Sequence, residues 1–134
     1  MAREPDLSAG GVLEWRDPDG ELDRADGPAR IFPSGREEWF RHGRLHRSDG
    51  PAVVHANGST KWYRDGVRHR EGAPACEYVN GTEKWYLNGL RHREDGPAAI
   101  YPDGRELWFI EGVRVDPQPA GEETGRGDGA LRSD

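Results

Sequence analysis

The chain repeats with a period of 23 residues, and this period constrains its fold more than any other feature. Trp39, Trp62, Trp85 and Trp108 share the spacing, as do Pro28, Pro51, Pro74 and Pro97, and His46, His69 and His92. Four full units follow, at 21–43, 44–66, 67–89 and 90–112. Such a period is typical of arrays in which each unit is stabilised by its neighbours. Trp15 is one residue out of phase, which indicates a one-residue insertion between Trp15 and Gly20.

Each unit carries two turn signals, such as Asn57-Gly58 and Asp65-Gly66 in the second unit. Both dipeptides favour type I′ hairpin turns, whose two central residues have positive φ. Short β-prone runs at 52–55 and 60–63 lie on either side of the first of these turns. The sequence therefore predicts an all-β fold, an elongated antiparallel β-meander of tandem hairpin repeats with two short strands per unit.

Composition favours a thin array over a thick globule. Only 33% of the residues are hydrophobic, and 19 glycines and 10 prolines disfavour long helices. No apolar run approaches the roughly 18–20 residues that a membrane span needs. We expect a flexible N-terminus at 1–10, the repeat array at 11–116 and a disordered tail at 117–134, which has no aromatic residue.

Charge and cysteine content limit the partners and the compartment. The net charge is -6, but 21–112 holds 14 basic and 15 acidic residues, so we do not expect a nucleic-acid partner. A single cysteine, Cys76, and an N-terminus without a signal pattern favour a cytoplasmic location. The excess of arginine over lysine suggests a GC-rich genome, bacterial or phage.

Two aromatic columns are adjacent in sequence, so they should lie on opposite faces of the sheet. We expect the tryptophans, prolines and histidines given above to be structural, with Ile31, Val54 and Ile100 between the tryptophans. The second aromatic column and the arginines that follow the histidines are the candidate partner-binding residues: Phe40, Tyr63, Tyr86, Phe109, Arg47, Arg70 and Arg93. The arginines could instead pair internally with Asp49, Glu71 or Asp95, or bind phosphates.

Catalysis and metal binding have little support in the sequence. Histidines of successive units should be about 10 Å apart, whereas Zn–N bonds are roughly 2 Å, so they cannot share one ion. No serine has the context of a nucleophile elbow, and Cys76 occupies a strand column. We expect no enzyme activity, no catalytic residues and no cofactor. The Arg-Gly-Asp tripeptide at 126–128 is interpreted as a chance match.

Two kinds of segment resemble a known family. Asn-Gly-Leu-Arg-His at 88–92 and Tyr-Pro-Asp-Gly at 101–104 resemble MORN repeats, and the 23-residue period agrees. The His-Arg-x-Asp-Gly-Pro-Ala linker, at 46–52 and 92–98, is similar to variant MORN-type repeats of bacteria, phages and large viruses. The resemblance covers about 15–115. It implies an elongated, twisted antiparallel sheet that serves as a protein-interaction or scaffolding surface, with antitoxin-like or immunity-like roles among the variants.

The chain departs from the standard MORN pattern, which has glycine where Arg47, Arg70 and Arg93 follow histidine. The leading hypothesis is a non-enzymatic module that binds an unidentified protein, of antitoxin, immunity or phage anti-defence type. Tyr63→Ala and Tyr86→Ala should then abolish partner capture and leave thermal stability nearly unchanged. The alternative is a binder of an anionic small molecule, nucleotide or nucleic acid along the arginine column. Self-association through open sheet edges is a third hypothesis, and a monomer or a small homo-oligomer both remain open.

Overall fold

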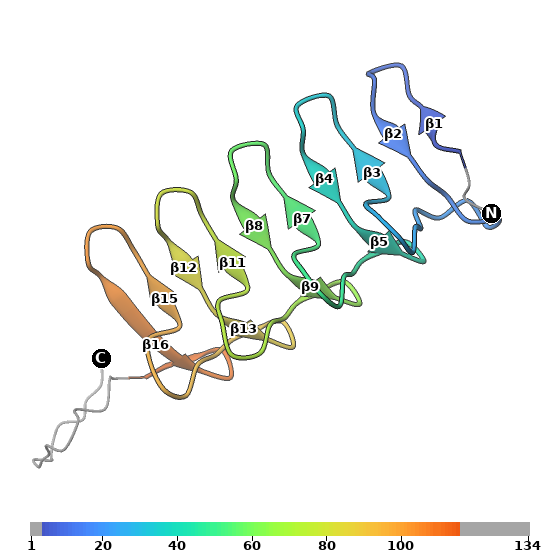
Figure 1. Cartoon of the computed structure of the whole chain (residues 1–134). Helices are drawn as coiled ribbons and strands as arrows, with labels where there is room; N and C mark the ends of the chain where they lie inside the picture. Colours follow the sequence, from blue (N-terminus) through green and yellow to red (C-terminus); the bar gives the residue numbers. More distant parts are fainter. Residues whose placement is uncertain (1–3, 116–134) are drawn as a thin grey trace, which may run out of the picture.

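The computed structural model describes residues 4–115, which form an elongated row of β-hairpins (Figure 1). No helix occurs among these residues, and the strands pair antiparallel. The predicted all-β hairpin meander is confirmed. The tail expected at 117–134 and the Arg-Gly-Asp tripeptide lie outside the described residues.

Five larger hairpins build one long sheet. They are β1 (Asp6–Leu7) with β2 (Leu13–Glu14), β3 (Arg30–Ile31) with β4 (Glu37–Glu38), β7 (Val53–Val54) with β8 (Thr60–Lys61), β11 (Cys76–Glu77) with β12 (Glu83–Lys84), and β15 (Ala99–Ile100) with β16 (Glu106–Ile110). Neighbouring hairpins also pair, β4 with β7 for example, so the sheet has 11 strands including β17 (Val113–Val115). Because β1 pairs with β2, the array begins at Asp6, earlier than the predicted boundary at residue 11.

The second turn of each unit closes a separate small hairpin, so the prediction of only two strands per unit is wrong. The small hairpins are β5 (Phe40–Arg41) with β6 (Arg44–Leu45), β9 (Tyr63–Arg64) with β10 (Val67–Arg68), β13 (Tyr86–Leu87) with β14 (Leu90–Arg91), and the end of β16 with β17. The pairing partner changes at the tryptophan. Trp39 N–H donates to Ala52 of the next unit, whereas the Trp39 carbonyl accepts from His46 N–H of the small hairpin.

The two kinds of turn differ in backbone conformation. In the small hairpins both central residues have positive φ, 50° at Asp65 and 87° at Gly66, which confirms type I′. In the larger hairpins only the glycine does, as at Gly58 (96°), so type I′ is wrong there. Each of these wider loops is closed by a backbone bond, His55 N–H to the Ser59 carbonyl in the second unit. The Asn57 side chain also accepts a hydrogen bond from Ser59 N–H.

The predicted insertion lies in the loop after Trp15. Arg16 pairs with Leu22 as Phe40 pairs with Leu45, but five residues, 17–21, separate the first pair, and four separate the second. The extra residue therefore widens the first turn, and the repeat returns to phase after it.

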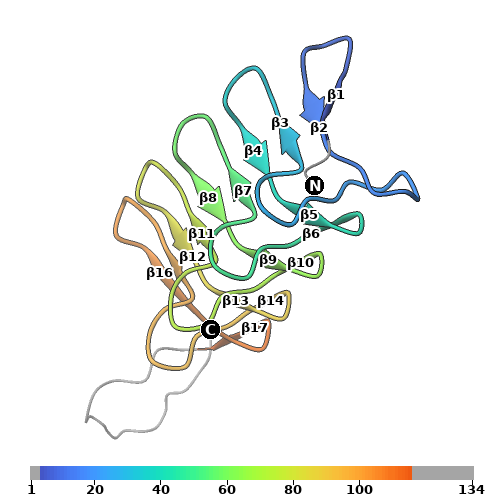
Figure 2. The same ribbon diagram turned by 45° about the vertical axis from the view of Figure 1, so that its right-hand side comes forward.

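The small hairpins stack in a second row beside the larger ones (Figure 2). The turn glycine of each donates its N–H to the preceding one, as Gly66 does to the Leu45 carbonyl at 2.8 Å. A further backbone bond joins Arg47 N–H to the Tyr63 carbonyl. Contacts between units therefore run along both rows.

The core is thin and rests on small residues. The alanine after each linker proline is completely buried: Ala29, Ala52, Ala75 and Ala98. Ile31, Val54 and Ile100, which we expected between the tryptophans, are only half-buried. Close approach of neighbouring backbone segments replaces the bulky interior that the composition cannot supply.

Candidate interaction surfaces

The arginine after each histidine of the column, and Arg24 after Asp23 in the first unit, stacks on the indole of the preceding unit. The pairs are Arg24 on Trp15, Arg47 on Trp39, Arg70 on Trp62 and Arg93 on Trp85, with Cζ-to-ring-centre distances of 3.9, 3.7, 4.0 and 3.8 Å. One Nη of each arginine also donates to the carbonyl of the linker proline, as Arg47 does to Pro51 at 3.1 Å. These guanidinium groups are thus engaged within the array, and their predicted role in partner binding stays a prediction.

The linker acids and glycines fit around this arginine. Arg93 Nε donates to Asp95 at 3.1 Å, and a methyl group on Gly96 would lie 2.6 Å from Arg93 Cζ. The third linker has Gly72 and Ala73 in place of that Asp-Gly pair, and Gly72 has a φ of +79°. The left-handed glycine gives this linker a different path, on which Arg70 still donates to Pro74.

The histidines join one small hairpin to the next. Nδ1 of His46, His69 and His92 accepts a hydrogen bond from the backbone N–H of Asp65, Asn88 and Glu111, at 3.0, 2.9 and 2.8 Å. These three donors are the left-handed residues of the type I′ turns. In the first unit Asp23 replaces histidine and accepts from His42 N–H at 2.8 Å. The histidine column therefore has a structural role, as an acceptor of hydrogen bonds.

The second aromatic column is only partly open. Phe40, Tyr63 and Phe109 are half-buried, whereas Tyr86 is 8% exposed and packs with Ala75 and Cys76. The Tyr86 hydroxyl accepts hydrogen bonds from Arg68 at 3.2 Å and Arg91 at 3.0 Å. Unchanged stability of Tyr86→Ala is therefore no longer expected, because a buried ring would be lost. A partner-binding role for this column stays a prediction.

Electrostatics around this cluster follow from burial and two arginines. Burial raises the pKa of Tyr86, but hydrogen bonds and charge from Arg91 and Arg68 outweigh burial, so the pKa of Tyr86 is lowered overall. Burial also raises the pKa of the Cys76 thiol, which is fully buried. A protonated, inaccessible thiol is a poor nucleophile.

The outer face of the small hairpins changes character along the array. Its cross-strand pairs are Arg41 with Arg44, Arg64 with Val67, Leu87 with Leu90 and Ile110 with Val113. Val67, Leu90, Ile110 and Val113 are 44%, 50%, 37% and 65% exposed, and with Leu87 we call them the aliphatic strip. A methyl group on Gly89 would lie 3.6 Å from Val67 Cβ, and one on Gly112 3.4 Å from Leu90 Cδ2, so successive hairpins are in close contact here. Sequence reasoning missed this surface.

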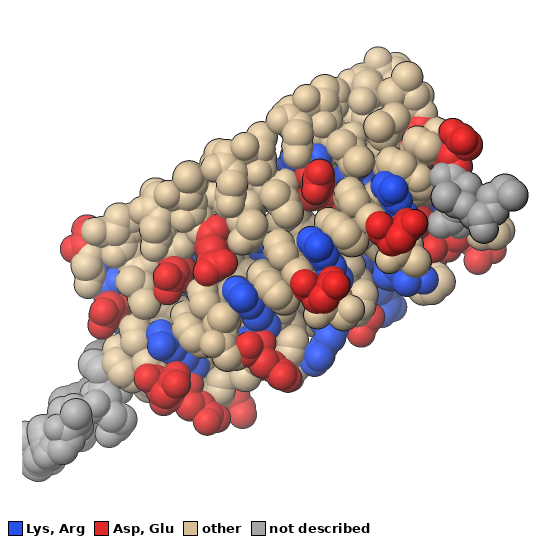
Figure 3. Space-filling view, in the orientation of Figure 1, with Lys and Arg blue, Asp and Glu red and all other residues tan. Residues whose placement is uncertain are grey.

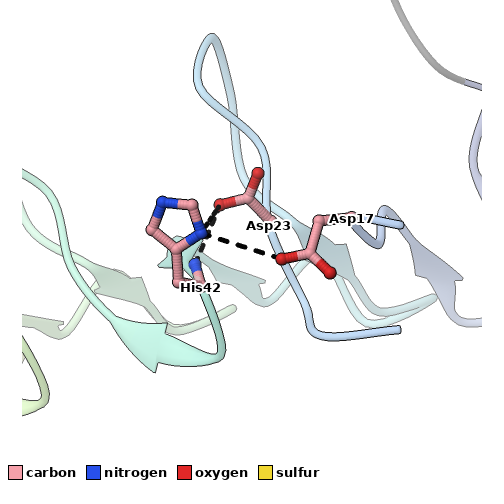
Figure 4. Close-up of side chains that lie close together, drawn as sticks. All are labelled: Asp17, Asp23 and His42. Carbon is pink, nitrogen blue, oxygen red and sulfur yellow. Dashed lines mark hydrogen bonds and ion pairs between the residues drawn. The ribbon is translucent and has the colours of Figure 1, made fainter. Parts of the chain in front are cut away.

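One unrepeated cluster combines Asp17, Asp23 and His42 (Figure 4). One potential ligand atom from each lies within 4.8 Å of the others, and His42 Nδ1 is 3.7 Å from an oxygen of each aspartate. Carboxylate and imidazole are metal-ligand types, but Arg41 Nε already lies 2.9 Å from Asp23 Oδ1. Asp17 Oδ1 accepts from the N–H groups of Asp19 and Glu21. We therefore assign the cluster to closing the widened first turn.

Charges are mixed over the face in Figure 3, where basic side chains alternate with acidic ones along the row of hairpins. Within residues 4–115 no helix is long and apolar enough to cross a bilayer.

Comparison of the chain with protein-family models, with curated proteins and with solved structures found no match. The resemblance to MORN repeats therefore stays a prediction.

Proposed function

We propose that the chain is a non-catalytic repeat module that binds a protein partner through the small hairpins. The observation that carries this proposal is the aliphatic strip. Exposed aliphatic side chains from successive hairpins form a contiguous apolar surface on a protein that is otherwise rich in charge. Contiguous apolar surface of this kind marks interaction sites more often than isolated exposed residues do.

The strip also indicates the chemistry of its partner. Arg41, Arg44 and Arg64 lie on the same outer face, on the hairpins that precede the purely aliphatic pairs. A complementary protein segment carries apolar side chains at one end and acidic side chains at the other. Charge complementarity of this kind fixes orientation and accelerates association more than it adds affinity.

Finer parts of the proposal rest on the sequence alone. They are membership of the MORN-type repeats, an antitoxin, immunity or anti-defence role, a bacterial or phage source and a cytoplasmic location. The absence of catalysis is supported by the use of the repeated polar residues, whose arginines and histidines make structural contacts. The half-buried Tyr63 remains a second candidate contact.

The test compares two exposed sites by partner capture from the source lysate. Leu90→Arg combined with Val113→Arg places charge in the strip, and Val79→Arg is the matched control, because Val79 is 67% exposed on a larger hairpin. Burying each strip residue contributes roughly 1.5–3 kcal/mol, so the double variant should weaken capture more than tenfold. The same melting temperature should be found for both variants. Undiminished capture by a folded double variant would contradict the proposal, and Tyr63→Ala tests the aromatic column separately.

A further inference from the structure

A groove lies between the second and third units, where the side chains are unusually rich in hydrogen-bond donors. Its volume is about 390 Å³, and its polar lining comes from Arg47, Ser48, Arg64, His69, Arg70 and Glu71. The rings of Trp62 and Tyr63 complete the lining. Five of the six polar residues can donate, and Glu71 is the one carboxylate among them.

His69 contributes a buried donor without a hydrogen-bond acceptor. Its Nδ1 accepts from Asn88 N–H at 2.9 Å, so we assign the proton of the neutral ring to Nε2. The residue is 7% exposed, and Nε2 makes no hydrogen bond within the described part of the chain. Glu71 Oε2 lies 3.7 Å from Nε2, which is beyond hydrogen-bond length. A buried donor left in this way is costly unless a ligand or water satisfies it.

Arg64 supplies the positive charge that distinguishes this groove. It is exposed and forms no ion pair with any of residues 4–115. The equivalent positions hold Arg41, which is bound to Asp23 at 2.9 Å, and the apolar residues Leu87 and Ile110. The unpaired guanidinium is thus a property of one groove and not of the repeat.

A second departure from the repeat pattern also makes the charge of this groove more positive. Ser48 stands where the next two units have Glu71 and Glu94. The groove therefore holds three arginines and one glutamate, whereas the equivalent positions one unit later hold two arginines, Arg70 and Arg93, and two glutamates.

The neighbouring acids leave part of each stacked arginine available. Asp49 lies 3.4 Å from Arg47 Nε, and Glu77 lies 3.5 Å from Arg70 Nη1. In both arginines Nη1 also donates to the carbonyl of the linker proline. Neither contact uses Nη2 of these arginines. Guanidinium N–H groups match the oxygens of a phosphoryl group, and a ligand with several oxygens can engage more than one arginine.

We propose that this groove binds a phosphomonoester, with the phosphoryl dianion on Arg47, Arg64 and Arg70 and the donors of His69 and Ser48 on its remaining oxygens. Tyr63 offers a ring on which a flat group attached to the phosphate can pack. The ligand class is therefore a nucleoside monophosphate or, without the flat group, free phosphate. This site shares Arg64 with the outer face proposed to contact a protein partner, but it does not use Leu90 or Val113 of the aliphatic strip.

The test is calorimetric titration of the full chain, at constant ionic strength and in phosphate-free buffer, with inorganic phosphate, AMP and adenosine. Arg64→Leu and Ser48→Glu introduce residues that the array already carries at equivalent positions, so both variants should fold. Arg105→Leu removes one positive charge from a residue that is bound to Asp103 on the last larger hairpin, and serves as the control.

Saturable binding of phosphate or AMP that weakens at least tenfold in Arg64→Leu and Ser48→Glu, and less than twofold in Arg105→Leu, supports the site. Tighter binding of AMP than of phosphate assigns a nucleotide, and equal binding assigns the phosphoryl group alone. Equal weakening in all three variants, adenosine binding as tight as AMP, or no saturation by millimolar phosphate or AMP would overturn the proposal.

Discussion

The linker arginine makes several different contacts in each unit. Arg93 stacks on Trp85, donates to the Pro97 carbonyl and pairs with Asp95. A cation over an indole contributes about 0.5–2 kcal/mol, depending on how far it is removed from water. Repeated four times, this arrangement covers one face of Trp15, Trp39, Trp62 and Trp85 and orders the linker that carries the arginine. It explains how a chain with few large aliphatic residues keeps its aromatic residues from water.

His55 gives the array a pH-dependent stability at residue scale. It occupies the position of Phe32, Tyr78 and Tyr101 in the other units. Burial, and then the charges of Lys61 and Arg36, lower the pKa of His55 below its ordinary value of 6.5, although Glu38 raises it. The unfolded chain therefore binds a proton more readily than the folded chain, so stability falls as the pH drops below 6.5 towards the lowered folded pKa.

We predict that wild type loses more thermal stability than His55→Tyr when the pH is lowered from about 7.5 to about 5. Tyrosine is the residue that the array itself uses at this position, so the packing is retained. Melting temperatures of both proteins are measured at both pH values. Subtracting the change in one protein from the change in the other removes the effect of titratable groups that the two proteins share. An equal loss in the two proteins would refute the assigned direction.

At the scale of elements, the small hairpins depend on their predecessors. Each type I′ turn donates two N–H groups backwards, one to a carbonyl and one to the histidine or aspartate of the preceding small hairpin. An isolated two-stranded hairpin is marginal in water, so these bonds hold each small hairpin in place. The first unit shows that a carboxylate oxygen can replace the imidazole nitrogen as acceptor.

We predict that His92→Ala lowers the free energy of unfolding by about 1–3 kcal/mol, because Glu111 N–H loses its acceptor. His92→Asn, whose side-chain oxygen can take the place that Asp23 Oδ1 has in the first unit, should recover a measurable part of that loss. Urea denaturation of the three proteins provides the measurement. Equal destabilisation by alanine and asparagine would show that packing of the imidazole, and not its acceptor atom, matters.

At the scale of the whole molecule, the strand pairs of the long sheet and the backbone hydrogen bonds of the stacked small hairpins join neighbouring units within residues 4–115. Stability should then be a sum of unit and interface contributions. The chain ends carry much of the net negative charge, and the body is close to neutral. Most of the aliphatic strip lies towards the C-terminal end of the array and the basic groove lies between the second and third units, and the two proposed sites meet where Val67 pairs with Arg64.

We predict that removal of 67–89, one whole unit, leaves a shorter array that still folds. The excision joins Gly66 to Leu90, which restores the order of the repeat and lets Lys61 face Ala99 instead of Cys76. Since 23 of 112 described residues are removed, the urea m-value should fall by about a fifth, with lower stability. Circular dichroism and urea titration measure both. An unfolded product would indicate contacts beyond nearest neighbours.

The period predicted the repeat units and the insertion after Trp15, and the turn dipeptides with the β-prone runs predicted the all-β class. Turn dipeptides such as Asp65-Gly66 predicted positive φ because few residues other than asparagine, aspartate and glycine accept it. These features are local, so residues a few positions apart decide them. The same dipeptide logic was wrong at Asn57-Gly58, where a wider loop satisfies the backbone with a side-chain bond.

Only the tertiary structure decided which repeated residues are used inside the array and which remain exposed. The bond from Asn88 to His69 and the stack of Arg70 on Trp62 depend on how one unit is placed on the next. Leu90 and Val113 are exposed because the second turn of each unit leaves the sheet, which the repeat pattern does not reveal. A period specifies that units are alike, whereas the rotation and offset between units come from packing and hydrogen bonds between residues far apart in the chain.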